Sequence, residues 1–346
     1  MGRRAMTISQ QWTLASRPQG APTADNFKWV ETELPAPGEG QVLARTLWMS
    51  LDPYMRGRMS EGASYASPVP VGGVMEGETV GEIIESRDSR FKPGDIVAGR
   101  SGWQSHWVLP AAELRALPKG PFPLSYHLGM LGMPGLTAYT GLMRIGQPKA
   151  GETVCVAAAS GAVGSIVGQI AQRLGCRTIG IAGGKEKCDF VVNELGFDAC
   201  LDHHDANLGA ALKEAAPKGI DIYFENVGGK VWEAVLPRLN DFARVPVCGL
   251  IAAYNATSRE ELSGSILMAE LMRAVLVKRL HLEGFIVSDY WAETMPKFAA
   301  DMTRWQGEKL FVYREDVTEG LKNAPEAFIG LLEGKNFGKA VVKVAD

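Results

Sequence analysis

The stretch that decides the fold is ETVCVAAASGAVGSIVG, residues 152–168, where an apolar run breaks into a glycine turn and opens a helical pattern. The β-branched first part predicts a buried strand in a parallel sheet. Gly161 and Gly164 stand where a dinucleotide-binding turn has its second and third glycines, and Ala159 takes the place of the first. Gly161 lets the backbone approach a pyrophosphate, and Gly164 lets the helix pack closely on the strand. The helix N-terminus then offers N–H groups to the phosphates.

The next strand carries the signal for the cofactor type. Residues 177–182, RTIGIA, end about 20 residues beyond the turn, where an NAD enzyme has an Asp or Glu for the ribose. This chain has GGKEK at 183–187 instead. Two glycines leave room, and Lys185 and Lys187 favour the 2′-phosphate of NADP. The alternative is that both lysines are solvated residues at a helix start. With the glycine turn present and the acid missing, we expect NADP.

Length and composition narrow the function classes. A chain of 346 residues exceeds the usual size of one domain, so we expect two domains that share a cofactor cleft. A net charge of −3 argues against a nucleic-acid or anionic-membrane partner, and no window of about 18 apolar residues predicts a membrane span. The start, MGRRAMTISQ, lacks the apolar core of a signal peptide. Five scattered cysteines are typical of a reducing compartment, and we expect the cytoplasm.

A metal site is not expected, because zinc requires Cys or His residues grouped at ligand spacing. His203 and His204 form the only close pair in the sequence. Neighbouring side chains at a strand end are expected to point in opposite directions, so this pair is not expected to share a metal ion.

The texture of the sequence changes along the chain. Residues 1–128 are rich in Pro and Gly, and short alternating runs at 41–48 and 78–85 predict a small antiparallel barrel. From about residue 128, strands alternate with helices, which predicts a doubly wound parallel sheet of six strands. After the two strands above, these are residues 199–201, 221–225, 244–248 and 281–287. Pro246 lies inside its run, which weakens that prediction. Residues 340–344 predict a strand that returns to the first domain.

Several segments together resemble one family: SLDPYM (50–55), the AASGAVGSIVGQIA turn, ENVGG (225–229), CGLIAAYN (248–255) and NFGK (336–339). The chain resembles the zinc-free medium-chain dehydrogenase/reductases, in the branch of prostaglandin reductases and alkenal/one oxidoreductases, with bacterial NADPH-dependent curcumin reductases most similar. The resemblance covers nearly the whole chain. It implies an α/β protein with a GroES-like β-barrel catalytic domain (1–128 and 309–346) and an NADP-binding Rossmann domain (129–308). The zinc ligands of related alcohol dehydrogenases are missing, which fits reduction of C=C bonds.

The resemblance also implies the cofactor contacts. The pyrophosphate would bind at Gly161, Ala162, Val163 and Gly164, and the 2′-phosphate would contact Lys187 and His203. Asn226 would contact the nicotinamide-side ribose, and the nicotinamide would lie against Phe285, Ile286, Val287 and Asn336. The cofactor would also be lined by Cys248, Gly249 and Tyr254. His203 departs from the pattern, since relatives have a tyrosine there. A histidine donates to phosphate and titrates near neutrality, so affinity is expected to depend on pH. The alternative is a surface histidine without a ligand.

The chemistry implied is hydride transfer from NADPH to the β-carbon of an enone. This step leaves an enolate, which hydrogen-bond donors must stabilise. Tyr54 and Tyr254 come from the two domains and are expected to meet across the cleft as these donors. Tyr65, in the loop EGASYASP, is expected to bind substrate. The alternative interpretation of each tyrosine is a half-buried residue that only packs against its neighbours. The cofactor's ribose hydroxyl is an alternative donor.

Other functions stay open at this point. A quinone reductase of the same superfamily would use the same cofactor domain but would need no enolate donor. A zinc-free member can also be an NADPH-binding structural or nucleic-acid-binding protein, against which the acidic net charge and the tyrosines weigh. The size of the substrate pocket is expected to depend on loops around Tyr65, Trp103 and residues 257–265. Residues 281–287 are expected to pair with their copy across a two-fold axis, giving a homodimer.

Overall fold

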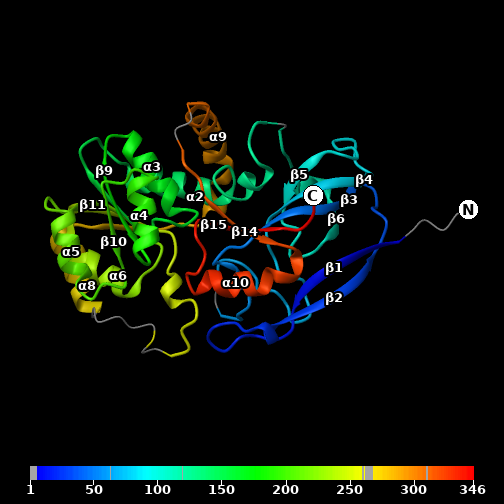
Figure 1. Cartoon of the computed structure of the whole chain (residues 1–346), viewed down its shortest axis with the longest axis horizontal. Helices are drawn as coiled ribbons and strands as arrows, with labels where there is room; N and C mark the ends of the chain where they lie inside the picture. Colours follow the sequence, from blue (N-terminus) through cyan, green and yellow to red (C-terminus); the bar gives the residue numbers. More distant parts are fainter. Residues whose placement is uncertain (1–5, 63, 119, 259–260, 262–267, 309–310) are drawn as a thin grey trace, which may run out of the picture. The chain divides into compact units, whose positions relative to one another are not determined.

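The computed structural model describes residues 6–62, 64–118, 120–258, 261, 268–308 and 311–346. The chain divides into two compact units (Figure 1). Unit 1 comprises residues 1–129 and 315–346, and unit 2 comprises residues 130–314. The expected domain boundary at residue 309 lies outside the described residues. Within these residues, no helix is both long and apolar enough to cross a membrane.

Unit 2 is built on a six-stranded sheet in the order β10-β9-β8-β11-β12-β13, with every neighbouring pair parallel. The expected doubly wound parallel sheet is therefore confirmed. Every residue of the central strand β8 is buried, and β11 is apolar except for Asp221, as a sheet covered on both faces requires. The strands are β8 (Thr153–Ala157), β9 (Arg177–Ala182), β10 (Ala199–Asp202), β11 (Ile220–Phe224), β12 (Leu239–Val247) and β13 (His281–Gly284).

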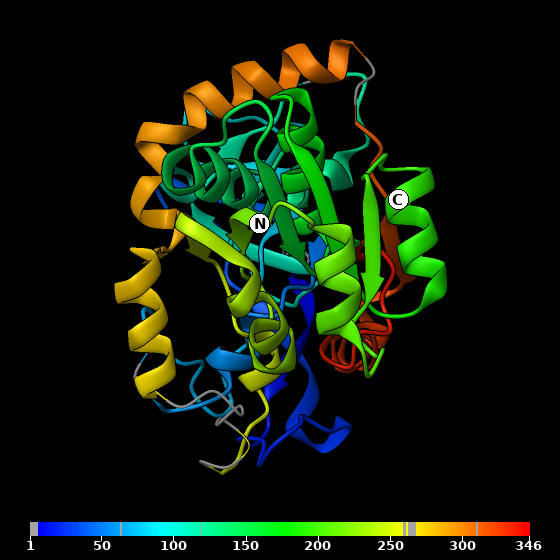
Figure 2. The ribbon, with the colours of Figure 1, turned by 90° about the vertical axis from the view of Figure 1, so that its left-hand side faces the viewer.

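Helices cover both faces of this sheet (Figures 1 and 2). Apolar residues of α5, α6 and α8 share one core cluster with β8, β9, β11 and β12. α3 and α4 pack on β8, β9 and β10, and α2 contacts α3 and α9. The helices are α2 (Met133–Thr140), α3 (Gly164–Arg173), α4 (Lys185–Asn193), α5 (Leu208–Ala215), α6 (Gly229–Val235), α8 (Met268–Lys278) and α9 (Trp291–Gly307). Shorter turns are η4 (Gly141–Gly146), η5 (Leu236–Arg238), η6 (Ile251–Ala253) and η7 (Val287–Tyr290).

The sixth strand is shorter than its sequence predicts. β13 ends at Gly284, whereas the apolar run continues through Val287, where η7 begins. The apolar sequence extends beyond the strand because Phe285 is a core residue, 7% exposed, whose ring packs edge-on against Phe224. The expectation of a strand over 281–287 was therefore wrong in its last three residues. Pro246, by contrast, does not interrupt β12, which keeps one register with β13.

Unit 1 is rich in strands. A seven-stranded sheet has the order β14-β15-β3-β4-β5-β7 with β6 on β3, and β1 and β2 form a separate antiparallel pair. All pairs are antiparallel except β14 with β15. The returning tail is confirmed, because β15 pairs with β3. The strands are β1 (Thr7–Leu14), β2 (Phe27–Leu34), β3 (Gln41–Ser50), β4 (Thr79–Ser86), β5 (Ile96–Gly99), β6 (His106–Pro110), β7 (Arg115–Ala116), β14 (Glu315–Glu319) and β15 (Lys339–Lys343).

Two helices and four short turns complete unit 1. They are α1 (Met55–Arg58), α10 (Ala324–Leu332), η1 (Ala24–Asn26), η2 (Ala111–Glu113), η3 (Leu124–Leu128) and η8 (Leu321–Asn323). Its core includes Trp103, which is fully buried, lies parallel to the ring of Phe27 at 5.6 Å and meets the ring of Phe328 edge-on. Trp103 therefore packs inside this unit, and the expectation that the loop around it affects the size of the substrate pocket stays a prediction. In the other loop expected to shape the pocket, residues 259–260 and 262–265 lie outside the described residues.

Candidate functional site

The turn between β8 and α3 has the geometry of a phosphate site. A Cβ on Gly164 would lie 2.3 Å from the carbonyl oxygen of Ala158, and one on Gly161 would lie 3.2 Å from it. Glycine at 164 therefore lets α3 begin directly beside the end of β8. The positive φ of this turn, 52°, falls on Ala158 and not on Ala159, which the sequence pattern aligns with the first glycine. The first N–H groups of α3 lie at the carboxyl edge of the sheet, where dinucleotide phosphates bind.

A second cluster lies at the ends of β9 and β10. The Nε2 atom of His203 lies 2.8 Å from the position that a Cβ on Gly183 would take. The pKa of His203 is below its ordinary value, first through partial burial and then through the charges of His204 and Lys187. Lys187 therefore lies within electrostatic range of His203. Lys185 differs, because its side chain is 85% exposed and pairs with Asp189 one helical turn away.

The sequence predicted that the side chains of His203 and His204 point in opposite directions. In the structure they lie side by side instead. Their ring centroids are 4.0 Å apart. The alternation of a strand does not apply to them, since β10 ends at Asp202. The carboxylate of Asp202 accepts hydrogen bonds from the backbone N–H groups of Gly184 (2.9 Å) and His204 (3.0 Å). Asp202, which the sequence analysis missed, therefore ties the turn after β9 to the end of β10.

The ENVGG segment is a turn around a buried carboxylate. Glu225 is 2% exposed, and its Oε1 accepts from the backbone N–H groups of Val227 (2.6 Å) and Gly228 (2.9 Å). Burial raises the pKa of Glu225, and these hydrogen bonds oppose the rise. Asn226 donates from Nδ2 to the carbonyl oxygen of Ala157, at 2.8 Å. Asn226 therefore lies next to the end of β8, beside the phosphate turn.

The expected lining residues of unit 2 follow the same edge. The N–H groups of Cys248 and Gly249 both donate to the Glu225 carbonyl oxygen, at 2.9 and 3.2 Å. The hydroxyl of Tyr254 lies 3.1 Å from the position that a Cβ on Gly249 would take, so it lies over this loop. The Phe285 ring is in the core, whereas Ile286 and Val287 are partly exposed. The expected contact of this segment with the nicotinamide stays a prediction, for which Ile286 and Val287 have the more accessible side chains.

In unit 1, Tyr54 and Tyr65 flank an arginine that the sequence analysis missed. The Arg58 guanidinium lies 4.3 Å from the Tyr65 ring centroid and 5.7 Å from that of Tyr54. Arg58 is 4% exposed, and its Nε pairs with Glu76 at 2.6 Å. Tyr54 immediately precedes the four-residue helix α1, whereas Tyr65 is 59% exposed. The only local signal was RGR directly after DPYM, which reads as surface charge.

The ionisation of Tyr54 suits a hydrogen-bond donor. Burial, and then the negative charges of Asp52 and Glu76, hold its pKa well above the ordinary value. Tyr54 is therefore a neutral phenol across the physiological pH range. Asn336 lies in the same unit and donates from Nδ2 to the carbonyl oxygen of Gly338, at 2.8 Å. Tyr54 and Tyr254 belong to different units, so their meeting at one substrate stays a prediction.

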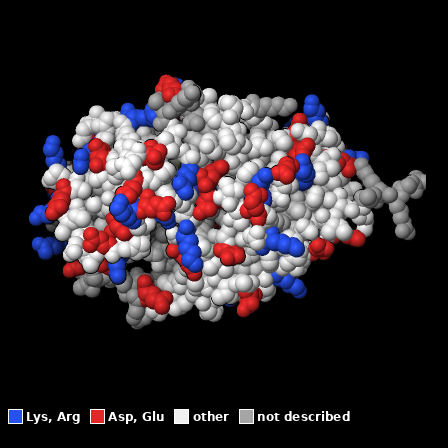
Figure 3. All heavy atoms as spheres, viewed as in Figure 1, with Lys and Arg blue, Asp and Glu red and all other residues white. Residues whose placement is uncertain are grey.

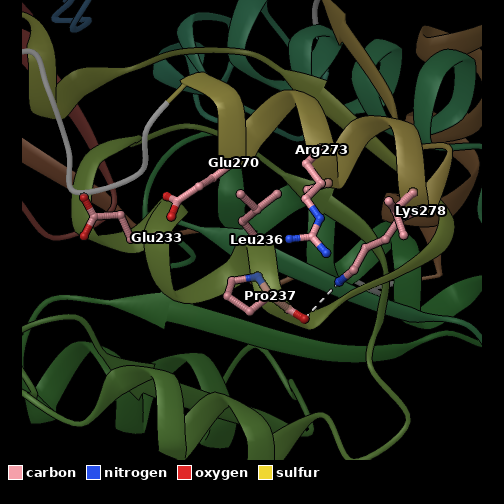
Figure 4. Close-up of a pocket in the computed structure, with 8 residues that line it drawn as sticks. Glu233, Leu236, Pro237, Glu270, Arg273 and Lys278 are labelled. Carbon is pink, nitrogen blue, oxygen red and sulfur yellow. Dashed lines mark hydrogen bonds between the residues drawn. The ribbon is translucent and has the colours of Figure 1, made fainter.

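A surface pocket of about 480 Å³ lies elsewhere on unit 2, between η5 and α8 (Figure 4). Lys278 lines it and donates to the carbonyl oxygens of Pro237 (3.0 Å) and Leu239 (2.7 Å). Leu239 is the first residue of β12, so the pocket lies toward the amino ends of the strands, away from the phosphate turn.

Acidic and basic residues are interspersed on the face in Figure 3. In the described part of the chain, no group of three or more His, Cys, Asp or Glu is arranged to hold a metal ion.

Comparisons with known proteins agree with this geometry. Residues 10–117 match a family model described as the N-terminal domain of oxidoreductase, and residues 162–304 match one described as zinc-binding dehydrogenase. The chain is 53% identical to the NADPH-dependent curcumin reductase of Escherichia coli, over 97% of each protein. It is 42% identical to prostaglandin reductase 1 of Bos taurus, over 98% of this chain and 100% of the relative. It is also 42% identical to the NADP⁺-dependent 2-alkenal reductase of Nicotiana tabacum, over 92% of each.

Solved structures give the same picture. CurA from Vibrio vulnificus in complex with NADPH superposes with a TM-score of 0.93 at 52% identity, over 97% of this chain and 99% of that one. A quinone oxidoreductase from Pseudomonas syringae superposes with a TM-score of 0.75 at 22% identity, over 97% of this chain and 99% of that one. The second likeness shows a shared fold alone.

The carboxyl group of Glu78 generates a pH prediction. Burial raises its pKa to about 7 against the opposing charges of Arg115, Arg100 and Lys339, while the charge of Asp52 adds to the rise. Between about pH 4.5 and 7 the folded state holds a proton that the unfolded state has lost. Stability therefore falls as pH rises through this window, by up to about 3 kcal/mol from this group.

Glu78→Gln should remove this contribution, because the amide resembles the protonated carboxyl group. We expect the stability of Glu78→Gln relative to wild type to increase from pH 4.5 to pH 8, as measured by urea unfolding at each pH. A constant difference between the two proteins over this range would contradict the prediction.

Proposed function

This chain belongs to the medium-chain dehydrogenase/reductase superfamily, and on that premise we propose that it is an NADPH-dependent reductase of the C=C bond of α,β-unsaturated ketones and aldehydes. The observation that carries the proposal is the turn between β8 and α3, where the Ala158 carbonyl oxygen leaves no room for a side chain at position 164, as in a dinucleotide-binding turn. In unit 1, the partly buried phenol of Tyr54 is the proposed donor for the substrate oxygen. The relatives named curcumin reductase, prostaglandin reductase and 2-alkenal reductase support the same substrate class.

The residues of unit 2 fit NADPH. Gly164 lets α3 begin against the Ala158 carbonyl oxygen, so the N–H groups at the start of α3 lie at the sheet edge where a pyrophosphate binds. Lys187 and His203 supply two proposed donors for a 2′-phosphate, and Gly183 directly follows β9, where an NAD enzyme has an acidic residue for the ribose. When bound, NADPH supplies the hydride for the β-carbon of the substrate. Asn226, Ile286 and Val287 are proposed to orient its nicotinamide end.

The tyrosines are proposed to stabilise the enolate. As negative charge develops on the substrate oxygen, a phenol hydroxyl donates a hydrogen bond that strengthens in the transition state. The raised pKa of Tyr54 keeps the proton on the phenol, so Tyr54 stabilises the oxyanion without giving up the proton. Tyr254 is the second proposed donor, and the α-carbon takes its proton from solvent or a ribose hydroxyl. The products are the saturated carbonyl compound and NADP⁺.

A quinone reductase of the same superfamily is the second candidate, because it would use the same cofactor domain. Quinone reduction needs no enolate donor, so the two candidates differ in their dependence on Tyr54. Oxidation of NADPH with a simple enone and with a simple quinone, in wild type and Tyr54→Phe, separates them. The enone reductase loses its rate in the variant, and the quinone reductase keeps it.

We infer that the protein forms a homodimer through β13. This strand is an edge of the sheet and is partly exposed. Beside it, α8 leaves the apolar side chains of Met268, Met272 and Leu276 exposed by 71%, 57% and 76%. Figure 2 shows α8, in yellow, at the margin of unit 2. We also infer a cytoplasmic location, which the five free cysteines support.

Lys187→Ala should erase the preference for NADPH over NADH. We expect wild type to prefer NADPH by at least ~10-fold in kcat/KM, because a paired phosphate contributes about 1.5–3 kcal/mol. Lys185→Ala is the matched control, since its side chain points to solvent and pairs with Asp189. It should change the preference by less than about twofold. Equal kcat/KM values for the two cofactors in wild type would contradict the assignment.

Tyr54→Phe and Tyr254→Phe should each slow enone reduction by ~10–1000-fold, the range for loss of an oxyanion donor. The ring is kept, so stability and NADPH affinity should stay near wild type. Single-turnover reduction, with NADPH binding measured separately, tests this. Tyr126→Phe controls for loss of a partly buried phenol hydroxyl in unit 1. Unchanged rates in both test variants would mean that the ribose hydroxyl and water suffice.

Gly284→Pro should weaken the proposed dimer. The N–H of Phe285 donates to Val247 of β12, so the N–H of Gly284 points to the open edge by the alternation of a strand. Proline removes that donor and leaves the pairing with β12 in place. Light scattering at micromolar concentration should give a dimer mass for wild type and a lower average mass for the variant. A monomer mass for wild type would refute the dimer.

A further inference from the structure

Lys339 carries an ammonium group deep inside unit 1. Its side chain is 1% exposed, although it begins strand β15. Its Nζ donates to the carbonyl oxygen of Leu51 at 2.7 Å and to Oδ1 of Asp52 at 2.8 Å. The other carboxylate oxygen of Asp52 accepts a hydrogen bond from the hydroxyl of Ser50. These contacts join the start of β15 to the end of β3.

Stability alone does not account for this pair. Removing an ammonium and a carboxylate from water is costly, and apolar side chains of similar volume often stabilise a core equally well. The surrounding core offers such an environment, since Leu51, Met49 and Met55 are all fully or almost fully buried. Lys343, on the same strand, instead reaches solvent, with its side chain 30% exposed. We therefore consider which part of the chain the Lys339–Asp52 pair holds in place.

The pair holds the point at which the chain leaves β3 toward Tyr54. Leu51 and Asp52 directly follow the last residue of β3. Pro53, whose ring fixes φ, is the one residue between Asp52 and Tyr54. The Asp52 carbonyl oxygen accepts from the N–H of Met55 at 3.1 Å, so Asp52 and Tyr54 share one tight turn. The Lys339 ammonium group anchors the backbone of Leu51 and the carboxylate of Asp52, directly before this turn. It therefore helps to determine the position of the Tyr54 side chain.

The anchor is itself held in place. Residues 336–338 precede Lys339, and the N–H of Phe337 donates to the Asp316 carboxylate of β14 at 2.8 Å. β14 and β15 then pair in parallel from Glu315 with Lys339 onward. Lys339 therefore projects from a segment that is tied to the sheet on one side and, through β15, to β3 on the other.

We infer that Lys339 is a positioning residue for Tyr54, whose phenol it holds, through Leu51 and Asp52, in the orientation that donates to the substrate oxyanion. The inference rests on the proposed role of Tyr54 in enone reduction. It goes beyond that role because it assigns a function to a buried charge pair that is not itself placed against substrate or cofactor.

The test separates positioning from stability with a paired variant. Lys339→Met alone leaves Asp52 buried without its cation, so Tm and turnover should both fall. Asp52→Leu/Lys339→Met removes both charges, and Tm should recover to near the wild-type value. Its single-turnover rate of enone reduction should nevertheless stay about 10–100-fold below wild type, because small displacements of a reacting group are costly. The dissociation constant for NADPH should change by less than about twofold. Lys343→Met is the matched control on the same strand and should leave Tm and rate unchanged.

The Tyr54→Phe background shows whether the effect passes through the phenol. If it does, adding Asp52→Leu/Lys339→Met to Tyr54→Phe should cost less than about a further twofold in rate, since coupled residues are not additive. A paired variant that regains rate together with Tm would overturn the inference, as would a full additional loss in the Tyr54→Phe background. Tyr54→Phe at the wild-type rate would instead refute Tyr54 as a donor, a failure of the proposed function that is visible without any change at residue 339.

Discussion

The carbonyl oxygen of Ala158 sets the architecture of unit 2. It occupies the space that a side chain at 164 would need and crowds one at 161, so α3 starts close to the end of β8 with its N–H groups at the sheet edge. The same close packing recurs along the interface, because a Cβ on Gly168 would lie 1.7 Å from the ring of Phe197. A Cβ on Gly180 would lie 2.9 Å from Val191 of α4. Small residues thus bring two helices near enough to the sheet for phosphate to meet backbone donors.

Unit 1 solves a different problem, which is to hold flexible aromatic side chains in fixed positions. Apolar burial is non-directional and cannot orient a phenol. The directional contacts come from two ion pairs. Lys339 and Asp52 form a buried pair before Tyr54, and the buried Arg58 pairs with the more exposed Glu76 beside the Tyr54 ring. Each charge is paired, as a low-dielectric interior requires. Hydrogen bonds from Lys339 to Leu51 and Asp52 offset part of the cost of burying this pair.

The sequence was most informative where structure follows local pattern. The buried run at residues 177–182 is the strand β9 without a change of bounds, because an apolar β-branched run has no other favourable place. Local pattern failed where an apolar residue serves the core outside a strand, as Phe285 does, and where alternation was applied to His203 and His204 beyond a strand end. It also gave no sign that Lys339 meets Asp52, 287 residues earlier, because only the tertiary fold brings them together.

The neutrality of Tyr54 follows from where the nearby charges are directed. Arg58 lies against its ring, and an unpaired guanidinium there would favour the phenolate. Glu76 pairs with Arg58 at 2.6 Å and also raises the pKa of Tyr54 directly, in the same sense as Asp52 and burial. The phenol therefore keeps its proton while a cation fixes its surroundings. The charge of Arg100 opposes the rise in the pKa of Tyr54 without reversing it. An oxyanion that forms beside this phenol would meet a neutral hydrogen-bond donor.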